Sequence, residues 1–213
     1  MSLDFDQLIG QLRTSLQGPL PGAAAHEPLR AVPIGEMRPV FQHKAPPKPG
    51  SVLILLYPDA GEIKFPLMKR PEYLGAHSGQ VSLPGGKAEA GETPVETALR
   101  EGEEEIGVRA ANIEIIGTLS EFFVIPSNFL VTPVVGIQRS KPIFSPDPVE
   151  VVRILNGTVS GLLREDAVMV SDITAAKVYR LRAPHFVFED EIVWGATAMM
   201  LNELREVVRG INR

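Results

Sequence analysis

The residues best suited to chemistry lie in one short stretch, residues 83–108, which reads LPGGKAEAGETPVETALREGEEEIGV. Three of its glutamates, Glu101, Glu104 and Glu105, are spaced i, i+3 and i+4, so that on a helix their carboxylates converge. At an effective dielectric near 20, each such pair repels by about 3 kcal/mol. A hard divalent cation such as Mg²⁺ or Mn²⁺, which prefers oxygen ligands, reverses that sign. The spacing therefore indicates a metal site, whereas the simpler alternative is a solvated acidic helix face.

The start and end of this helix are marked in the sequence. Thr93, Pro94 and Glu96 have the pattern of a capping box with proline at the first helical position. Gly107 follows as a C-terminal stop, so we expect a helix over residues 94–106. One face of that helix is apolar and should be buried: Val95, Ala98, Leu99, Gly102 and Ile106.

The complete spacing of the stretch is G-x5-E-x7-R-E-x2-E-E-x-G-V, starting at Gly86. It resembles the Nudix box, G-x5-E-x7-R-E-U-x-E-E-x-G-U, where U is apolar. The chain departs from the box at Gly102, where the box has an aliphatic residue or alanine. Because Gly102 lies on the apolar face, we expect it to let the helix approach a sheet closely, at a cost of up to ~1 kcal/mol in helix propensity.

Nudix proteins typically hydrolyse a nucleoside diphosphate linked to another group, using Mg²⁺ or Mn²⁺. The resemblance implies that Glu101, Glu104 and Glu105 are catalytic metal ligands, with a backbone carbonyl at Gly85 or Gly86 completing the shell. Arg100 is included in the catalytic set, and the resemblance implies that Arg100 and Glu92 form a structural pair that orients the loop and helix. The residues with a structural role in the box are Gly85, Glu92 and Gly107.

The general base stays open at this point, because Nudix families take it either from the box or from a later loop. The acids available outside the box are Glu121, Asp147, Glu150, Glu189 and Glu191.

Residues 67–87, LMKRPEYLGAHSGQVSLPGGK, resemble an additional motif of the coenzyme A pyrophosphatase branch of this superfamily. The chain departs from that motif at Gly75, where a basic residue is usual, and at Leu83, which replaces phenylalanine. The segments PSNFLVTPVVG and IVWGATAMML are also similar to that branch. The positions that fit the motif are Arg70, His77, Gly79, Val81 and Pro84 to Gly86.

This second resemblance implies hydrolysis of coenzyme A or acyl-coenzyme A to phosphoadenosine phosphate and (acyl-)phosphopantetheine. The candidate substrate-binding residues are Lys69, Arg70, His77 and Lys87. One alternative keeps the chemistry but changes the substrate to ADP-ribose, a dinucleotide or a damaged nucleotide. Another alternative is a non-catalytic ligand-binding Nudix domain, although such domains commonly lose one of the box glutamates, which are all present here.

The elements that must position these residues alternate between strand and helix patterns. We expect strands at residues 51–58, 62–70, 81–83, 111–124, 129–138, 149–155, 177–184 and 185–194, with amphipathic helices near both ends, at 3–18 and 195–210. This order predicts an α/β (α+β) fold, a Nudix-type α/β/α sandwich with a mixed sheet flanked by helices. We divide the chain into an N-terminal helix and Pro/Gly-rich arm, 1–47, and a Nudix domain, 48–213, in which Trp194 packs in the core.

Composition limits the possible partners. The net charge of −5 and the pI near 5.5 argue against a nucleic-acid binder, which needs a basic surface. There is no cysteine for disulfides or thiolate sites. No apolar run approaches the ~20 residues that span a bilayer, and no secretory signal pattern is visible. We therefore expect a cytoplasmic enzyme with a small-molecule substrate, and a homodimer by analogy with Nudix relatives.

Overall fold

A central mixed sheet organises the molecule. The computed structural model describes residues 4–34, 36–72 and 79–211, and in them the sheet has the strand order β4-β3-β2-β8-β6, with β5 beside β2, β7 beside β8 and β9 beside β3. Strands β2 and β8 are parallel, whereas the other pairs are antiparallel. These strands are β2 (Lys48–Asp59), β3 (Glu62–Lys69), β4 (Val81–Ser82), β5 (Gly85–Lys87), β6 (Glu114–Thr118), β7 (Phe122–Val124), β8 (Phe129–Ile137) and β9 (Arg153–Thr158).

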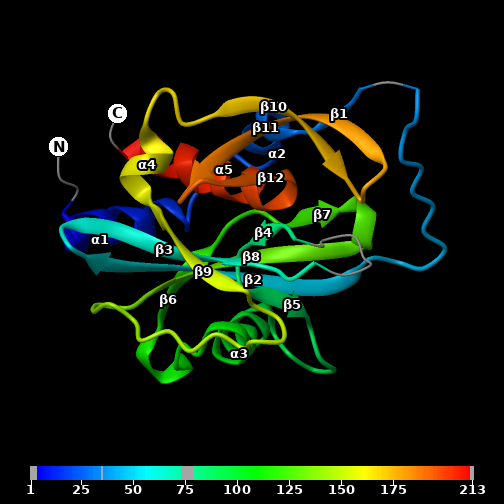
Figure 1. The fold of residues 1–213 in the computed structure, drawn as a ribbon. Helices are drawn as coiled ribbons and strands as arrows, with labels where there is room; N and C mark the ends of the chain where they lie inside the picture. The colour runs from blue at the N-terminus through cyan, green and yellow to red at the C-terminus, as the bar shows by residue number, and fades with distance from the viewer. Residues whose placement is uncertain (1–3, 35, 73–78, 212–213) are drawn as a thin grey trace.

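Helices and a second, smaller sheet cover the two faces of the central sheet. Figure 1 shows α3 below the central sheet and α1, α2, α5 and the smaller sheet above it. The smaller sheet contains β1 (Val32–Pro33), β10 (Met169–Ala175), β11 (Tyr179–Phe188) and β12 (Glu191–Trp194). The helices are α1 (Phe5–Ser15), α2 (Ala23–His26), α3 (Pro94–Ile106), α4 (Val159–Leu163) and α5 (Gly195–Ile211), with short 3₁₀ turns at Glu27–Leu29, Ala110–Asn112 and Ile125–Ser127. The layered α+β architecture predicted from the sequence is confirmed.

Strand β2 separates two hydrophobic clusters. Its alternate residues Leu53 and Leu55 pack with the apolar side of α3, while Ile54 and Leu56 pack with the cluster that includes α1 and α5. All four side chains are fully buried. A strand that is buried on both faces has a continuous apolar run, which explains the sequence SVLILLYP. At its end, Ala60 and Gly61 both have positive φ and close the expected hairpin into β3.

Several strand predictions were wrong in their boundaries. Residues 111–124 form two strands, β6 and β7, which both pair with β8 and are separated by residues 119–121. The expected strand at 149–155 begins only at Arg153 because residues 148–150 form a turn. The expected strands at 177–184 and 185–194 divide instead as β11 and β12. Strand β10 and helix α4 were not predicted.

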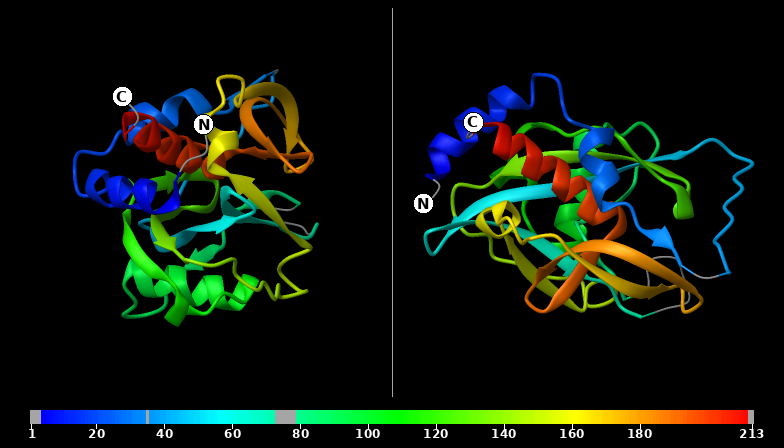
Figure 2. Two further views of the ribbon diagram at one scale, coloured as in Figure 1. Left: turned by 90° about the vertical axis from the view of Figure 1, so that its left-hand side faces the viewer. Right: turned by 90° about the horizontal axis from the view of Figure 1, so that it is seen from above.

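The N-terminal residues pack against the rest of the chain. Leu8, Ile9 and Leu12 of α1 are buried in the main hydrophobic cluster, and β1 pairs with β11. Figure 2 shows α1 and α2 lying alongside the C-terminal helix α5. The division of the chain at residue 47 stays a prediction. No helix in the described residues is both long and apolar enough to cross a bilayer.

Candidate active site

Helix α3 has the ends that its sequence predicts. Thr93 accepts a hydrogen bond from the Glu96 amide, and the Glu96 carboxylate accepts one from the Thr93 amide, which completes the capping box. Gly107 adopts the left-handed conformation that ends the helix, with φ 73°. Gly102 brings the helix close to β2, because a Cβ atom there would lie 2.8 Å from Leu53 Cδ2. The buried face differs in detail, since Val95 and Leu99 are only partly buried, while Thr97 and Glu105 are buried.

Two glutamates of α3 lie against the glycines of β5. The Gly85 amide donates a 2.7 Å hydrogen bond to Glu105 Oε2. A Cβ atom at Gly86 would lie 2.6 Å from Glu101 Cδ, so a side chain at this position would require the carboxylate to move. Gly85 in turn contacts β2 so closely that a Cβ would meet the Ser51 carbonyl and Val52. The two glycines thus let a strand backbone and two carboxylates share one small space.

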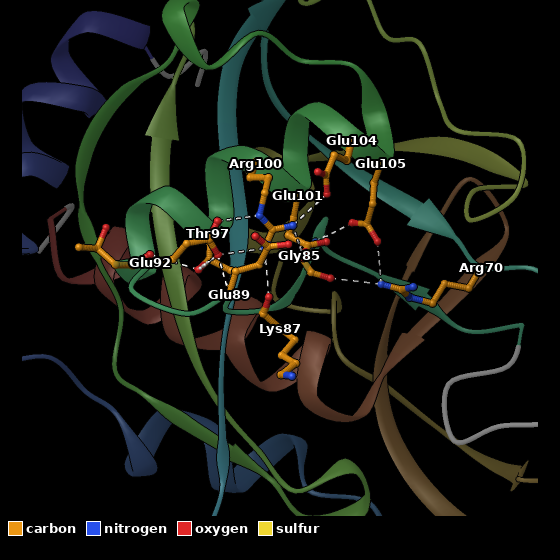
Figure 3. Close-up of polar contacts among 11 residues, drawn as sticks. Arg70, Gly85, Lys87, Glu89, Glu92, Thr97, Arg100, Glu101, Glu104 and Glu105 are labelled. Atoms are coloured by element: carbon orange, nitrogen blue, oxygen red, sulfur yellow. Dashed lines mark hydrogen bonds and ion pairs between the residues drawn. The ribbon is translucent and has the colours of Figure 1, made fainter.

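Arg100 holds this loop and helix together. It donates to both Glu92 carboxylate oxygens, from Nε at 2.7 Å and from Nη2 at 3.1 Å. Its Nη2 also donates to the Lys87 carbonyl at 3.0 Å, which ties α3 to the end of β5 (Figure 3). The hydrogen bonds from Arg100 lower the pKa of Glu92 to about 2, so Glu92 is an anion at neutral pH. The structural pairing expected for Glu92 and Arg100 is therefore present.

The third box glutamate, Glu104, is more exposed than the other two. Arg100 Nη1 donates to Glu104 Oε2 at 2.9 Å and to Glu101 Oε1 at 2.9 Å. The Glu104 side chain is 60% exposed, whereas those of Glu101 and Glu105 are 14% and 3% exposed. The three carboxylates are therefore an inner pair, Glu101 and Glu105, and an exposed acid, Glu104, that Arg100 Nη1 bridges to Glu101.

Burial and like charge destabilise the anionic forms of the inner pair. The pKa of Glu105 is raised to about 7, chiefly by burial and in part by the charges of Glu101 and Glu150, against the opposing charge of Arg70 and the hydrogen bond from the Gly85 amide. Burial also raises the pKa of Glu101, against the opposing hydrogen bond from Arg100. Two neighbouring carboxylates with these shifts are better stabilised as anions by a cation than by water.

The donor atoms at this place fit a hard divalent cation. Glu101 and Glu105 are a mutually repelling pair that is largely shielded from water. Their carboxylate oxygens are the ligand type that Mg²⁺ and Mn²⁺ prefer. The described residues contain no group of three or more acidic or histidine side chains already gathered for a metal ion. Arg70 and Arg100 take up the carboxylates instead. A metal bound here would therefore replace some of these ion pairs.

A loop after β8 brings a further acid to this cluster. The Asp147 amide donates to the Glu105 carbonyl at 3.0 Å, and the Asp147 carboxylate caps a turn by accepting from the Val149 amide at 2.7 Å. Glu150 follows in the same turn, close enough to raise the pKa of both Glu101 and Glu105. Among the five acids left open by the sequence, Glu150 is thus the one whose charge acts on both glutamates of the pair.

The other acids have different neighbours. Glu189 accepts hydrogen bonds from the Asn156 amide and side chain, each at 2.9 Å. Glu191 pairs with Lys69 at 2.6 Å and with Arg153 at 3.2 Å. Asp147 caps its own turn, and Glu121 is exposed beside β7. Sequence spacing could not distinguish these acids, because their distance from α3 depends on how the loops fold back.

The predicted substrate-binding residues separate in the structure. Arg70 lies at the site, where Nη2 donates to Glu105 Oε1 at 3.1 Å and Nε donates to Ser82 Oγ at 3.2 Å. Lys87 is exposed, next to Gly86. The Lys69 side chain instead pairs with Glu191. His77 lies outside the described residues.

A cavity of about 540 Å³ adjoins the two glycines on the side of the smaller sheet and α5. It is lined by Gly85, Gly86 and Arg70, and further by residues of β1, β7, β8, β11 and the start of α5. Trp194, expected in the core, is only partly buried and lines this cavity. The sequence did not predict the cavity, because its walls come from segments that are far apart in the chain, such as Ser51 and Leu181 or Ala31 and Trp194.

Residues 47–172 match the family model of the NUDIX domain. The chain is 35% identical to Nudix hydrolase 22, chloroplastic, of Arabidopsis thaliana over 76% of this chain and 56% of that protein. It is 32% identical to Nudix hydrolase 3 of Caenorhabditis elegans, over 72% of this chain and 70% of that protein. It is 33% identical to the Nudix hydrolase NudL of Yersinia enterocolitica, over 67% of this chain and 72% of that protein. The chain thus spans little more than half the length of the plant protein.

Among solved structures, the Nudix hydrolase RenU of M. smegmatis superposes with a TM-score of 0.55. The match covers 78% of this chain and 89% of that one, at 18% sequence identity. At this identity the likeness concerns the fold, and it agrees with the layered architecture described above.

Proposed function

Because this chain belongs to the Nudix hydrolase family, we propose that it is a metal-dependent pyrophosphohydrolase that cleaves the diphosphate of coenzyme A or acyl-coenzyme A. The products are phosphoadenosine phosphate and (acyl-)phosphopantetheine. In this reaction one water molecule is added across the P–O–P linkage, so that its oxygen bonds to one phosphorus and the bridging bond breaks.

The observation that supports this proposal most strongly is the pair Glu101 and Glu105 at Gly85 and Gly86. Glu105 is buried and Glu101 is partly buried, the two carboxylates repel each other, and both lie against glycines of β5 that carry no side chain. Arg70 and Arg100 each offset one of these charges, and a divalent cation between the carboxylates would offset the repulsion that remains. A solvated acidic helix face, the simpler alternative, would leave all of its carboxylates exposed, as it does for Glu103 and Glu104.

The proposed metal ligands are Glu101 and Glu105, joined by Glu104 when Arg100 releases it and by the backbone carbonyl of Gly86. A bound Mg²⁺ or Mn²⁺ neutralises the oxygens of a diphosphate and lowers the pKa of a water molecule beside it. The chain's own part is to fix the carboxylates. Arg100 does so by joining Glu92, Glu101 and the Lys87 carbonyl in one network.

Glu150 is the proposed general base. It lies on a turn that Asp147 caps and that is anchored to the Glu105 carbonyl. An exposed carboxylate in a short, hydrogen-bonded turn can accept a proton from water and pass it to the solvent. The other four candidate acids have partners elsewhere or lie on the surface beside β7.

Coenzyme A is the proposed substrate on two grounds. Four of the residues that resemble the coenzyme A pyrophosphatase motif, Arg70, Val81, Gly85 and Gly86, line the cavity beside the carboxylate pair. Arg70 is 3.1 Å from Glu105, so it is close enough to contact a diphosphate at that edge.

The test is a panel of coenzyme A, acetyl-coenzyme A, ADP-ribose and a dinucleoside polyphosphate, each with Mg²⁺ or Mn²⁺. We expect the coenzyme A compounds to have the highest kcat/KM, with phosphopantetheine identified as product. Higher turnover of ADP-ribose or of the dinucleotide would agree with the proposed diphosphate hydrolysis but contradict coenzyme A as the substrate. No cleavage of any of them, with the metals bound, would favour a ligand-binding domain.

A further inference from the structure

The cavity beside the glycine edge is largely apolar. Its walls include Val81, Phe129, Leu181 and Met200 on facing elements, and it is large enough for a small-molecule ligand. Among the described residues that line it there is no carboxylate, lysine or histidine. Apart from Arg30 and Arg70, the described lining offers no charged partner, so a phosphate placed away from these two arginines would be buried without one, which is costly.

The cavity does contain hydroxyl groups that can form hydrogen bonds with amides of a ligand. Ser51, Ser82, Ser127, Tyr179 and Thr197 line it. Each hydroxyl can both donate and accept a hydrogen bond, which suits a ligand whose polar groups are neutral amides. The two arginines that line the cavity form ion pairs, Arg30 with Glu27 at 2.8 Å and Arg70 with Glu105 at 3.1 Å.

The two halves of coenzyme A differ in this respect. The phosphoadenosine half carries an extra phosphate, whereas the pantetheine half is uncharged, with a branched hydrocarbon part, two amides and a sulfur. Gly85 and Gly86 border both the cavity and the carboxylate pair, so a diphosphate at this edge has one of its two substituents in the cavity. Lys87, exposed directly after Gly86, does not line the cavity and is available for phosphates outside it.

We propose that this cavity binds the pantetheine half of the substrate, with any short acyl group on its sulfur, and leaves the phosphoadenosine half outside. This inference rests on the proposed function. Specificity then depends on the uncharged half: the 3′-phosphate contributes little, and a short apolar extension of the thioester is favourable until the cavity is filled.

Trp194 allows a direct test, because it is the single tryptophan of the chain and lines the cavity. Titration with phosphopantetheine should shift its fluorescence emission to shorter wavelength as water is displaced. Titration with phosphoadenosine phosphate should leave the emission unchanged. A shift with phosphoadenosine phosphate but not with phosphopantetheine, or no shift with either, would overturn the proposal.

Kinetics give an independent readout. We expect dephospho-coenzyme A to match coenzyme A in kcat/KM within about threefold, since a lost hydrogen bond to a charged group would cost tenfold or more. Across the acetyl, butyryl and hexanoyl thioesters, kcat/KM should rise by up to about fourfold for each CH₂ that is buried. A tenfold loss with dephospho-coenzyme A, or a decline in kcat/KM with each added CH₂, would overturn the proposal.

Ala196→Leu, at the start of α5, should reduce the cavity and remove both the Trp194 response and the gain with acyl length. Ala111→Leu is the matched control, because Ala111 is exposed and lies outside the cavity, and it should keep both. If Ala196→Leu fails to fold, Ala31→Leu on another wall replaces it. Cleavage of coenzyme A without a Trp194 response would sink this inference alone, whereas failure to cleave any coenzyme A compound would sink the proposed function.

Discussion

Gly102 of α3 and Leu53 of β2 are in such close approach that a Cβ atom on the glycine would lie 2.8 Å from Leu53 Cδ2. Leu53 is fully buried in the cluster that joins α3 to the sheet. The absence of a side chain at Gly102 therefore sets how near the helix, and with it Glu101 and Glu105, comes to the strands. The one departure of this chain from the family pattern is thus a packing feature.

Gly102→Ala should destabilise the protein, although alanine is the better helix former. Overpacking a filled core costs about 1–3 kcal/mol, which exceeds the gain of about 1 kcal/mol from helix propensity. Adding Leu53→Val, which shortens the side chain at the contact by one methylene, should restore part of the loss. Urea unfolding of the single and double variants measures this.

Gly10→Ala provides the matched control. Gly10 lies within α1, and a Cβ there would meet nothing within 4 Å. This variant should gain up to about 1 kcal/mol from propensity alone. Equal gains at Gly10 and Gly102 would contradict the proposed close packing of α3.

Glu105→Gln should abolish most hydrolysis while leaving the fold in place. Glutamine keeps an oxygen that can accept from the Gly85 amide, but it removes one negative charge from the inner pair. Since even outer partners of metal ligands affect activity by 10–100-fold, we expect a loss of more than about 100-fold here. Glu103→Gln, an exposed neighbour on the same helix, should retain activity. The proposed site would be wrong if both variants behaved alike in steady-state kinetics.

Glu150→Gln tests the base. A positioned general base contributes about 10²–10⁴ in rate, so kcat should fall in that range while the concentration of Mg²⁺ needed for half-maximal activity stays nearly constant. Glu121→Gln is the control, because Glu121 is exposed beside β7. A fall in metal affinity with unchanged kcat at saturating Mg²⁺ would instead make Glu150 a ligand.

How much of this could be predicted depended on the range of the contacts involved. The bounds of α3 followed from Thr93, Glu96 and Gly107, which act on their own neighbours. The pairing of Glu92 with Arg100 was likewise predictable, since both lie in one loop–helix unit. The exposed position of Glu104 was not predictable, because which nearby carboxylates accept hydrogen bonds from Arg100 depends on side-chain geometry.

Contacts between distant segments were beyond the sequence pattern. Strand β11 continues through Pro184, although proline suggested a break. Pro184 lies between the part of β11 paired with β1 and the part paired with β12, so its missing N–H costs no ladder hydrogen bond on that side. Glu150 reaches the site, and Trp194 reaches the cavity, only through tertiary folding.

Glu203 of α5 is a fully buried carboxylate that joins α5 to the N-terminal segment. It accepts hydrogen bonds from the Gly22 amide at 3.0 Å, from Ser120 Oγ at 2.6 Å and from the Ser120 amide at 3.3 Å, and it lies 2.8 Å from His26 Nε2. Burial by itself raises the pKa of Glu203, but these partners outweigh it, so the pKa is lowered from 4.5.

A carboxylate whose pKa is lowered in the folded state stabilises the protein above its unfolded pKa, and this contribution is lost as pH falls through the folded pKa. Glu203→Gln should therefore destabilise the protein by about 1–3 kcal/mol at pH 7, and the difference from wild type should shrink below about pH 4.5. Urea unfolding at several pH values measures it, with Glu206→Gln on the same helix as control. A difference that stays constant or grows as the pH falls would mean that the charge on Glu203 does not stabilise the contact between α5 and the N-terminal segment.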